Sequence, residues 1–218
     1  MGASVSGVGV LDKSVSVLRA VADGPVNLSE LMERTGLSRA TAHRLAVALE
    51  AHGLLRRRGD GRFALGLGLV ALGRAAEAAL PLGELARPAL EALRDRTGES
   101  VQLYVREGDA RVCVAALESP HGLRTIVPLG AVLPLEVGSA GRVLRSDGDG
   151  TGWVHSVGER EAGVASVSAP VRDPDGRVVA AVSVSGPIER TSRRPGARYG
   201  GAVVDAAAAI ADALAGDA

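Results

Sequence analysis

Cysteine and aromatic residues are scarce in this sequence, and each shortage limits what the chain can be. Its one cysteine, Cys113, excludes an internal disulfide and is typical of proteins of the reducing cytosol. Aromatic residues are 2% of the 218, so a core has to be built from the Ala, Val and Leu that dominate the 46% hydrophobic residues. No uninterrupted apolar run approaches the roughly 18 residues that span a bilayer, and Met1 to Val10 lacks the basic start and apolar stretch of a secretory signal. We therefore expect a cytoplasmic protein.

Net charge is also lacking, but the charges are unevenly distributed. Residues 1–80 carry ten Lys or Arg against seven Asp or Glu, and residues 81–218 carry fifteen against eighteen. From Arg34 to Arg62 there are seven arginines against Glu50 and Asp60, a net charge of +5. A basic segment on a neutral chain indicates a local anionic partner, although a solvated arginine-rich surface gives the same count.

The N-terminal residues carry the signals of three short helices. Helical spacing predicts the first helix, ended by Gly24-Pro25, from Leu11, Val15, Leu18 and Ala22. Asn27 and Glu30 form a capping-box pattern for the second, which Gly36 ends in a left-handed conformation. Ser38 is the expected cap of the third helix, which ends at Gly53 and has a buried stripe of Ala42, Leu45, Ala46 and Leu49.

The second and third helices form a helix-turn-helix pattern, and a hairpin follows directly. Two helices joined by a short turn containing Gly are typical of this unit. Residues 54–65 read as two short strands around Asp60-Gly61, which predicts a β-hairpin in the position of a wing.

The rest of the chain predicts an α+β domain. Residues 66–80 read as a connecting helix that Pro81 interrupts, and 82–96 as an amphipathic helix with Leu85, Leu90 and Leu93 inward. Further elements are expected as strands at 100–106, 111–118, 163–171 and 177–185, a loop at 146–152 and a closing helix at 197–215.

In a helix-turn-helix the second helix lies in the major groove of DNA, with its N-terminal residues against base edges. Arg39 and Arg44 have forked donors that match guanine or phosphate. Ser38 and Thr41 can donate to phosphate, and Ala40 can meet a thymine methyl group. His43 either touches DNA or fills the turn between the helices.

The wing supplies further cations. Strand alternation sends Arg56 and Arg58 to one face and Arg57 to the other. We predict that these three and Arg62 bind phosphate without reading sequence.

Together these residues resemble the isocitrate-lyase-regulator (IclR) family of bacterial transcription factors from Val10 to about Arg190. The resemblance depends on the order and spacing of several pieces: residues 35–45 (TGLSRATAHRL), 61–66 (GRFALG), 98–100 (GES), 118–121 (ESPH), 170–173 (PVRD) and 183–187 (SVSGP). Within the family, the sequence is most similar to an actinobacterial branch that controls leucine and other amino-acid metabolic genes. Residues 41–50 (TAHRLAVALE) and 158–170 (GEREAGVASVSAP) carry this similarity.

The resemblance implies a transcriptional regulator of two domains. Residues 1–66 would be the winged helix-turn-helix, 67–80 a linker helix, and 81–218 a GAF/PAS-like effector-binding domain. It also implies dimers, often paired as tetramers, on palindromic operators, and a pocket for a small, usually anionic or amphipathic metabolite.

The pocket residues are carried over from the resemblance position by position. They are Gly122, Leu123, Thr125, Ser139, Ala140, Ser156, Val164, Ser166, Ser183 and Ser185. Serine hydroxyls, and backbone N–H groups near Gly138 and Ser139, can bind a carboxylate. Alternatively, the serines satisfy backbone groups at strand ends.

The chain departs from the family in this domain. Ser166 stands where many relatives have cysteine, and Ser156 where many have a carboxylate or an amide. Between Arg142 and Trp153 the family usually carries a longer stretch, so the domain is shortened and its pocket is open, altered in specificity or no longer ligand-binding.

An enzyme is not expected, nor a cofactor or a metal. The four histidines lack ligand spacing, and Cys113 in an apolar run indicates a buried strand residue rather than a nucleophile. The alternative function is a ligand-sensing module whose winged helix binds protein. Salt dependence of DNA affinity separates the two, because phosphate contacts release counterions.

Overall fold

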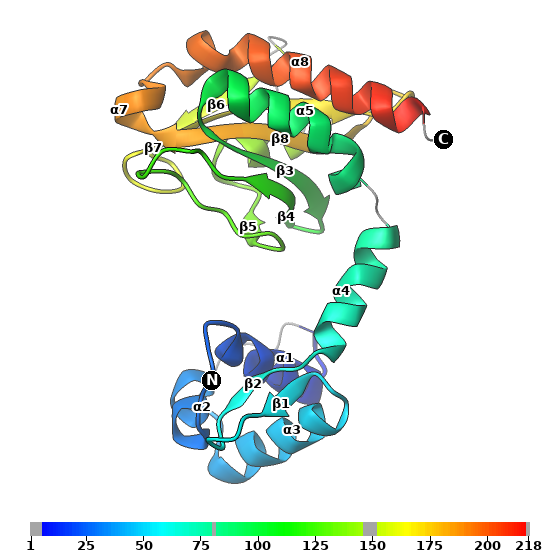
Figure 1. Ribbon diagram of the computed structural model, residues 1–218, viewed down its shortest axis with the longest axis vertical. Coiled ribbons are helices and arrows are strands. Elements are labelled where there is room, and N and C mark those ends of the chain that lie inside the picture. The colour runs from blue at the N-terminus through cyan, green and yellow to red at the C-terminus, as the bar shows by residue number, and fades with distance from the viewer. Residues whose placement is uncertain (1–5, 80–81, 146–151, 217–218) are drawn as a thin grey trace. The chain divides into compact units, whose positions relative to one another are not determined.

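The structure, a computed structural model, describes residues 6–79, 82–145 and 152–216. The chain divides into two compact units, Met1–Leu80 and Pro81–Ala218. Three short helices, a small hairpin and a further helix make up the first unit, and a sheet with helices makes up the second (Figure 1). In chain order the elements of the first unit are α1 (Gly9–Ala22), α2 (Leu28–Thr35), α3 (Arg39–Ala51), β1 (Leu55–Arg57), β2 (Phe63–Leu65) and α4 (Gly68–Ala79).

The boundaries of α2 and α3 are set by local hydrogen bonds, as the sequence predicts. The Glu30 amide donates to Asn27 Oδ1 and the Asn27 amide donates to Glu30 Oε2, both at 2.9 Å, which completes the capping box. Gly36 ends α2 at φ +68°, a conformation that favours glycine. Ser38 Oγ then accepts from the Thr41 amide at 3.4 Å and starts α3.

The core of the first unit lies between α1, α2, α3 and the hairpin. The predicted stripe of α3 is buried, from Ala42 to Leu49. The helix α1 forms as predicted, but Val17 and Val21 are its buried residues, and Leu11 is 53% exposed. Helical spacing fits this buried pair as well as the residues that the sequence predicted to face inward. Packing against α2 and α3 therefore decides which face of α1 is buried.

The hairpin pairs β1 with β2 antiparallel, with Arg57 opposite Phe63. Val26, just before α2, bonds to Phe63 through both backbone groups, at 2.8 and 2.9 Å. This bridge attaches the wing to the helices.

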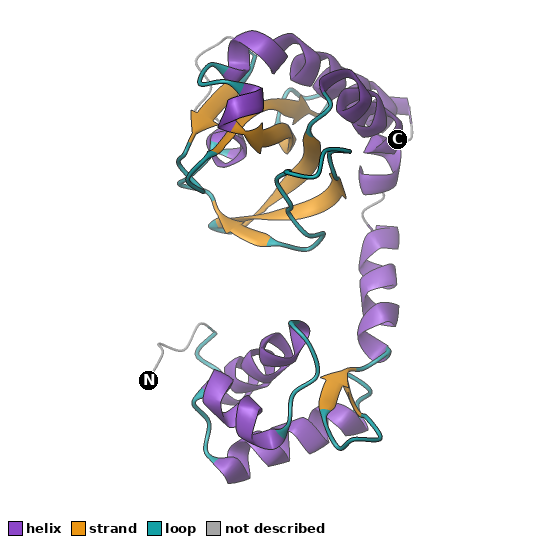
Figure 2. Cartoon of the chain, turned by 60° about the vertical axis from the view of Figure 1, so that its left-hand side comes forward, coloured by secondary structure: helices purple, strands orange, loops and turns teal. Residues whose placement is uncertain are grey.

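The second unit is built on one antiparallel sheet, whose strands are the larger group of orange arrows in Figure 2. The sheet has six strands in the order β5-β4-β3-β8-β7-β6. Its elements are α5 (Leu82–Thr97), β3 (Ser100–Glu107), β4 (Ala110–Leu117), β5 (Val132–Pro134), α6 (Ser139–Leu144), β6 (Val154–Val157), β7 (Val164–Arg172), β8 (Val178–Pro187), α7 (Ile188–Thr191) and α8 (Pro195–Gly216). The four predicted strands and two long helices are present, whereas β5, α6, β6 and α7 are short elements that the sequence pattern did not predict. Residues 146–151 of the predicted loop lie outside the described residues.

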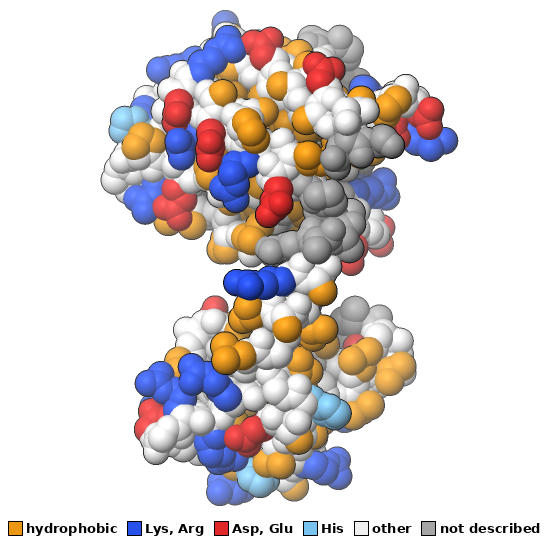
Figure 3. All heavy atoms as spheres, turned by 45° about the vertical axis from the view of Figure 1, so that its right-hand side comes forward, with side chains coloured by type: hydrophobic (Ala, Val, Ile, Leu, Met, Phe, Trp, Pro, Cys, Tyr) orange, Lys and Arg blue, Asp and Glu red, His pale blue; other side chains and the backbone are white. Residues whose placement is uncertain are grey.

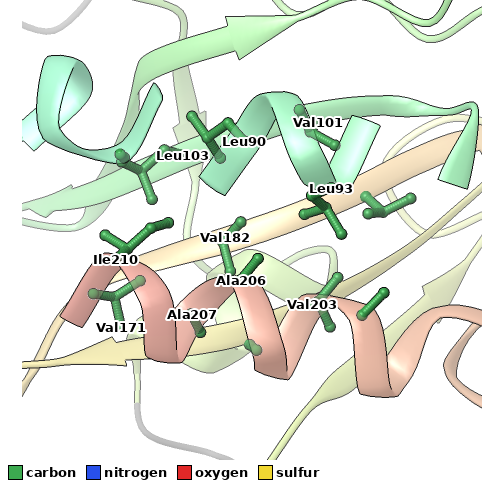
Figure 4. Packing of buried hydrophobic residues seen from close by; sticks show 14 of the residues in the cluster. Leu90, Leu93, Val101, Leu103, Val171, Val182, Val203, Ala206, Ala207 and Ile210 are labelled. Carbon is green, nitrogen blue, oxygen red and sulfur yellow. The ribbon is translucent and has the colours of Figure 1, made fainter. Parts of the chain in front are cut away.

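One face of the sheet is covered by α5 and α8. Alternate strand residues, among them Val101, Leu103 and Val182, face Leu90 and Leu93 of α5 and a row of α8 side chains that includes Val203 and Ile210 (Figure 4). By length and composition α8 is apolar enough to cross a membrane, but 39% of its apolar window is buried inside this unit. The residues of α8 that face the sheet, among them Tyr199, Val203 and Ile210, are buried in the core of this unit, so α8 is a core helix of the second unit.

Trp153, the only tryptophan, packs into a groove on α8 that two glycines form. A Cβ at Gly200 would lie 2.6 Å from Trp153 Nε1, and a Cβ at Gly196 would overlap the indole ring. The adjoining strand β6 is thereby held beside the helix.

The opposite face of the sheet carries a smaller apolar cluster and a polar region. Tyr104, Cys113 and Ala181 of the strands pack with Ala140 and Val143 of α6. Cys113 is fully buried in β4, as predicted. The remaining side chains on this face form the polar pocket described below.

Candidate functional site

The front of α3 is an exposed polar surface. Ser38, Arg39, Ala40, His43 and Arg44 are exposed, and Thr41 is half-buried. Within residues 6–79 and the other described ranges, neither Arg39 nor Arg44 makes a side-chain hydrogen bond or an ion pair. Their guanidinium groups therefore face solvent. Figure 3 shows exposed Lys and Arg side chains, in blue, on the first unit as well as on the second.

The wing arginines are exposed but differ in how firmly they are held. Arg56 Nε donates to the Leu65 carbonyl at 3.3 Å. The guanidinium carbon of Arg57 lies 4.5 Å from the centre of the Phe63 ring, and its Nε lies 3.7 Å from Glu50. Arg58 makes no side-chain bond to any residue that the structure describes. The contacts hold the guanidinium groups of Arg56 and Arg57 beside the hairpin.

Arg62 is directed into the unit. Its Nη2 lies 3.3 Å from Glu30 Oε1, and its Nη1 donates to the Pro25 carbonyl at 3.1 Å. The sequence pattern predicted that Arg62 binds phosphate. It did not indicate the ion pair with Glu30, which lies 32 residues earlier in the chain. Arg62 braces the wing against the start of α2.

A second candidate site is a polar pocket on the face of the sheet beside α6. It is lined by Gln102, Tyr104, Arg111, Gly138, Ser139, Ala140, Ser156, Arg160, Glu161, Val164, Ser166, Ser183 and Ser185. Seven of the ten residues predicted for effector binding are therefore together. The other three, Gly122, Leu123 and Thr125, do not line it: Leu123 is 70% exposed, and Thr125 is buried.

The serines of the pocket form a chain of hydrogen bonds. Ser139 Oγ lies 2.7 Å from Ser166 Oγ and 2.8 Å from Ser168 Oγ. Ser168 donates to Ser183 at 2.9 Å, and Ser156 Oγ lies 2.9 Å from Ser166 Oγ. Hydroxyls from α6, β6, β7 and β8 thus meet at one place, and each can act as donor or acceptor.

A separate side-chain bond in the pocket reaches β3, where Ser185 Oγ donates to Gln102 Oε1 at 3.0 Å. Strand alternation puts Ser183 and Ser185 on this face, as expected. The hydroxyls of Ser183 and Ser185 hydrogen-bond to other side chains. Pairing with backbone groups at strand ends therefore does not account for these two serines.

The backbone amides at Gly138 and Ser139 are already bonded. The Gly138 amide donates to Glu159 Oε2 at 3.1 Å, and the Ser139 amide donates to Ser156 Oγ at 3.2 Å. The expectation of free N–H groups here was wrong, because the chain itself supplies the acceptors.

The sequence reasoning missed the charged and aromatic members of the pocket. Arg111 is 2% exposed, and its guanidinium carbon lies 5.4 Å from the centre of the Tyr104 ring. Burial lowers the pKa of Arg111 and raises the pKa of Tyr104. Arg111 lies two positions before Cys113, on the same face of a strand, and this spacing was the signal for a buried arginine.

No group of three or more His, Cys, Asp or Glu side chains that could hold a metal ion occurs in the described ranges. The pocket chemistry is instead that of hydroxyl, amide and guanidinium groups, which bind polar or anionic ligands.

The chain matches two protein-family models. The IclR helix-turn-helix domain matches residues 10–59, and the bacterial transcriptional regulator IclR C-terminal domain matches residues 75–151 and 149–212. The last two segments meet at residues 149–151, in the region where the chain is expected to be shortened. Together these models cover well over half of the chain.

Several known proteins are similar over most of their length. The glycerol operon regulatory protein of Streptomyces griseus is 29% identical over 92% of this chain and 94% of its own. The HTH-type transcriptional regulator KipR of Bacillus subtilis is 27% identical, over 80% and 84%. An IclR homologue from Microbacterium hydrocarbonoxydans, solved in complex with 4-hydroxybenzoate, is 25% identical with a TM-score of 0.77, over 95% and 99%. These relatives are transcriptional regulators and not enzymes.

Proposed function

Because this chain belongs to the IclR family of DNA-binding transcriptional regulators, we propose that it reads operator DNA with α3 and responds to a small metabolite bound in the serine-lined pocket. Residues 1–66 are the DNA-binding domain in this proposal, 67–80 a linker helix and 81–218 the effector-binding domain.

The observation that carries the proposal is the exposed front of α3. Arg39 and Arg44 have no partner among the described residues, while the back of the same helix is buried from Ala42 to Leu49. A helix held from behind, with free guanidinium groups in front, fits the major groove. In this assignment α3 contacts DNA through Ser38, Arg39, Ala40, Thr41, His43 and Arg44, and the wing contacts phosphate through Arg56, Arg57 and Arg58.

We infer that the protein acts as a homodimer, or as a tetramer of paired dimers, on a palindromic operator. Exposed apolar residues support this assembly: Leu67, Val70 and Leu72, at the start of α4 and just before it, are 78%, 53% and 61% exposed. Large apolar side chains exposed to this extent favour a surface that a partner covers.

The effector is a small metabolite, and the regulated genes belong to amino-acid metabolism of the leucine type. The pocket chemistry supports a polar ligand, and the similar regulator from Microbacterium hydrocarbonoxydans was solved with the small molecule 4-hydroxybenzoate. Similarity to the actinobacterial amino-acid branch supports the pathway. A cytoplasmic location follows for a regulator that acts on chromosomal DNA.

The first experiment measures the affinity of the full chain for duplex DNA against salt concentration. A DNA-binding regulator gives a steep log–log slope of about −0.9 for each phosphate contact. A flat slope would instead favour the alternative, a ligand-sensing module that binds protein.

The second experiment tests the reading helix with operator DNA recovered by genomic footprinting. We expect Arg44→Ala to remove about 1–3 kcal/mol of discrimination between operator and unrelated DNA, because one guanidinium–base contact is lost. Arg19→Ala, at an exposed cation on α1, is the matched control and keeps the discrimination. Full discrimination by Arg44→Ala would overturn the placement of α3.

A further inference from the structure

Arg111 is a buried cation that has no ion-pair partner in the described part of the chain. Its Nη1 donates to the backbone carbonyls of Pro134 and Val137, the latter at 2.8 Å, and its Nε has no hydrogen-bond partner. It forms no ion pair with any residue that the structure describes. A charge removed from water is unfavourable unless an opposite charge or several hydrogen bonds compensate it.

Three carboxylates lie near Arg111, and none forms an ion pair with it among the described residues. Glu136 acts on it only through longer-range electrostatic attraction, which raises the pKa of Arg111 but does not offset the lowering by burial, and the other two are paired with other arginines. Glu159 lies 3.1 Å from Arg142 and also accepts the Gly138 amide. Glu161 lies 3.4 Å from Arg160. The ring of Tyr104 offers Arg111 a cation–π contact but no negative charge.

The guanidinium of Arg111 and a pocket hydroxyl face the same small space. A Cβ built on Gly138 would lie 3.4 Å from Arg111 Nη2 and 4.0 Å from Ser156 Oγ. Glycine leaves this point open, between a forked cationic donor and a serine hydroxyl. A planar or tetrahedral oxyanion is the group that such donors bind.

We propose that the ligand of this pocket carries one oxyanion, a carboxylate or a phosphate, and that Arg111 is the residue that selects it. The inference rests on the proposed role of residues 81–218 as the effector-binding domain. Ser156 completes the anion site, and Ser166, Ser183 and Ser185 bind the polar remainder of the ligand.

The size of the pocket limits what binds without movement. Its cavity volume is about 20 Å³, which is space for about one water molecule. A metabolite therefore displaces lining side chains when it binds, and the fixed element is Arg111, held by its two carbonyl partners.

The test is the melting temperature of the full chain in the presence of simple probes at constant ionic strength. The probes are sodium acetate, inorganic phosphate and acetamide, which has the shape of acetate without its charge. We expect acetate or phosphate to raise the melting temperature by a few degrees and acetamide to leave it unchanged. Comparing acetate with phosphate identifies the anion. Equal effects of acetamide and acetate would overturn the proposal, as would no effect of either anion.

Variants then assign the effect to Arg111. Arg111→Gln is expected to abolish the anion-dependent rise, with circular dichroism confirming the fold. Arg106→Gln is the matched control, because Arg106 is the exposed register partner of Arg111 on the neighbouring strand. A full rise in folded Arg111→Gln would overturn the assignment. If that variant does not fold, the wild-type comparison of acetate with acetamide still decides whether the site selects an anion.

The same proteins separate this inference from the proposed function. Arg111→Gln should keep the wild-type salt dependence of DNA binding, because Arg111 belongs to the other unit. If the DNA affinity of the wild type does not depend on salt, the proposed function as a DNA-binding regulator is wrong. If only the preference for an anion is absent, the proposed role of Arg111 is wrong and the proposed function stands.

Discussion

Arg62 Nη2 of the wing lies 3.3 Å from Glu30 Oε1, 32 residues earlier in the chain. The same carboxylate accepts the Asn27 amide and completes the cap of α2. One carboxylate therefore joins the start of the helix-turn-helix to its wing. The wing arginines differ accordingly: Arg62 holds the wing against α2, whereas Arg56, Arg57 and Arg58 are exposed.

This division predicts different effects for two arginines of the wing. Arg62→Ala should lower the free energy of unfolding by about 1 kcal/mol, because a half-exposed ion pair and a hydrogen bond to Pro25 are lost. Arg58→Ala should leave stability unchanged and make the salt slope of DNA binding shallower by about one unit. Urea unfolding and binding titrations measure the two quantities. The division would be wrong if Arg62→Ala changed the slope and Arg58→Ala did not.

The serine chain of the pocket predicts a stability effect. Ser168 is fully buried and bonds to both Ser139 and Ser183. Ser168→Ala should lower the free energy of unfolding by about 1–3 kcal/mol, because buried hydroxyls lose a partner. Ser29→Ala, at an exposed position of α2, serves as the control and should stay within about 0.5 kcal/mol of wild type. Equal stability of the two variants would show that Ser168 is not structurally required.

The groove that holds Trp153 predicts opposite effects at two adjacent glycines. Gly200→Ala should destabilise the domain by about 1–3 kcal/mol, because its methyl group meets the indole. Gly201→Ala, exposed on the same helix with open space around it, should stabilise by about 0.5–1 kcal/mol. Thermal unfolding followed by the fluorescence of the single tryptophan measures both. A neutral Gly200→Ala would mean that the indole moves aside without cost.

Cys113 predicts how stability changes in alkali. Burial raises the pKa of the Cys113 thiol from 9.0 to about 11. Below pH 9 both folded and unfolded chains keep the proton; between these values the unfolded chain loses it first, so stability falls as the pH rises. The loss from this group is about 2–3 kcal/mol.

Denaturant unfolding at several alkaline pH values measures this decline, and Cys113→Ala should show a shallower one. The thiol should also resist alkylation until the chain unfolds. Rapid labelling of the folded protein at about pH 8 would contradict the burial of Cys113.

The first unit was predictable from sequence because local chemistry determines its boundaries. The capping box at Asn27, the left-handed Gly36 and the Ser38 cap each need only residues within one turn of helix. The buried face of α1 was less predictable, since Val17 and Val21 and the predicted stripe satisfy the same spacing. In the second unit β5 and β6, of three and four residues, exist through pairing with β4 and β7, which local patterns do not encode.

The sequence by itself determined the kind of protein, because caps, apolar periodicity, turn residues and the order of the family motifs are all local in the chain. It also determined that Ser183 and Ser185 share a face, since alternation is a property of any strand. Only the tertiary structure decided which charges remain free. Arg62 meets Glu30, and Arg111 is buried with no ion-pair partner among the described residues. Electrostatic energy depends on distance and burial in space, and neither can be read from positions along the chain.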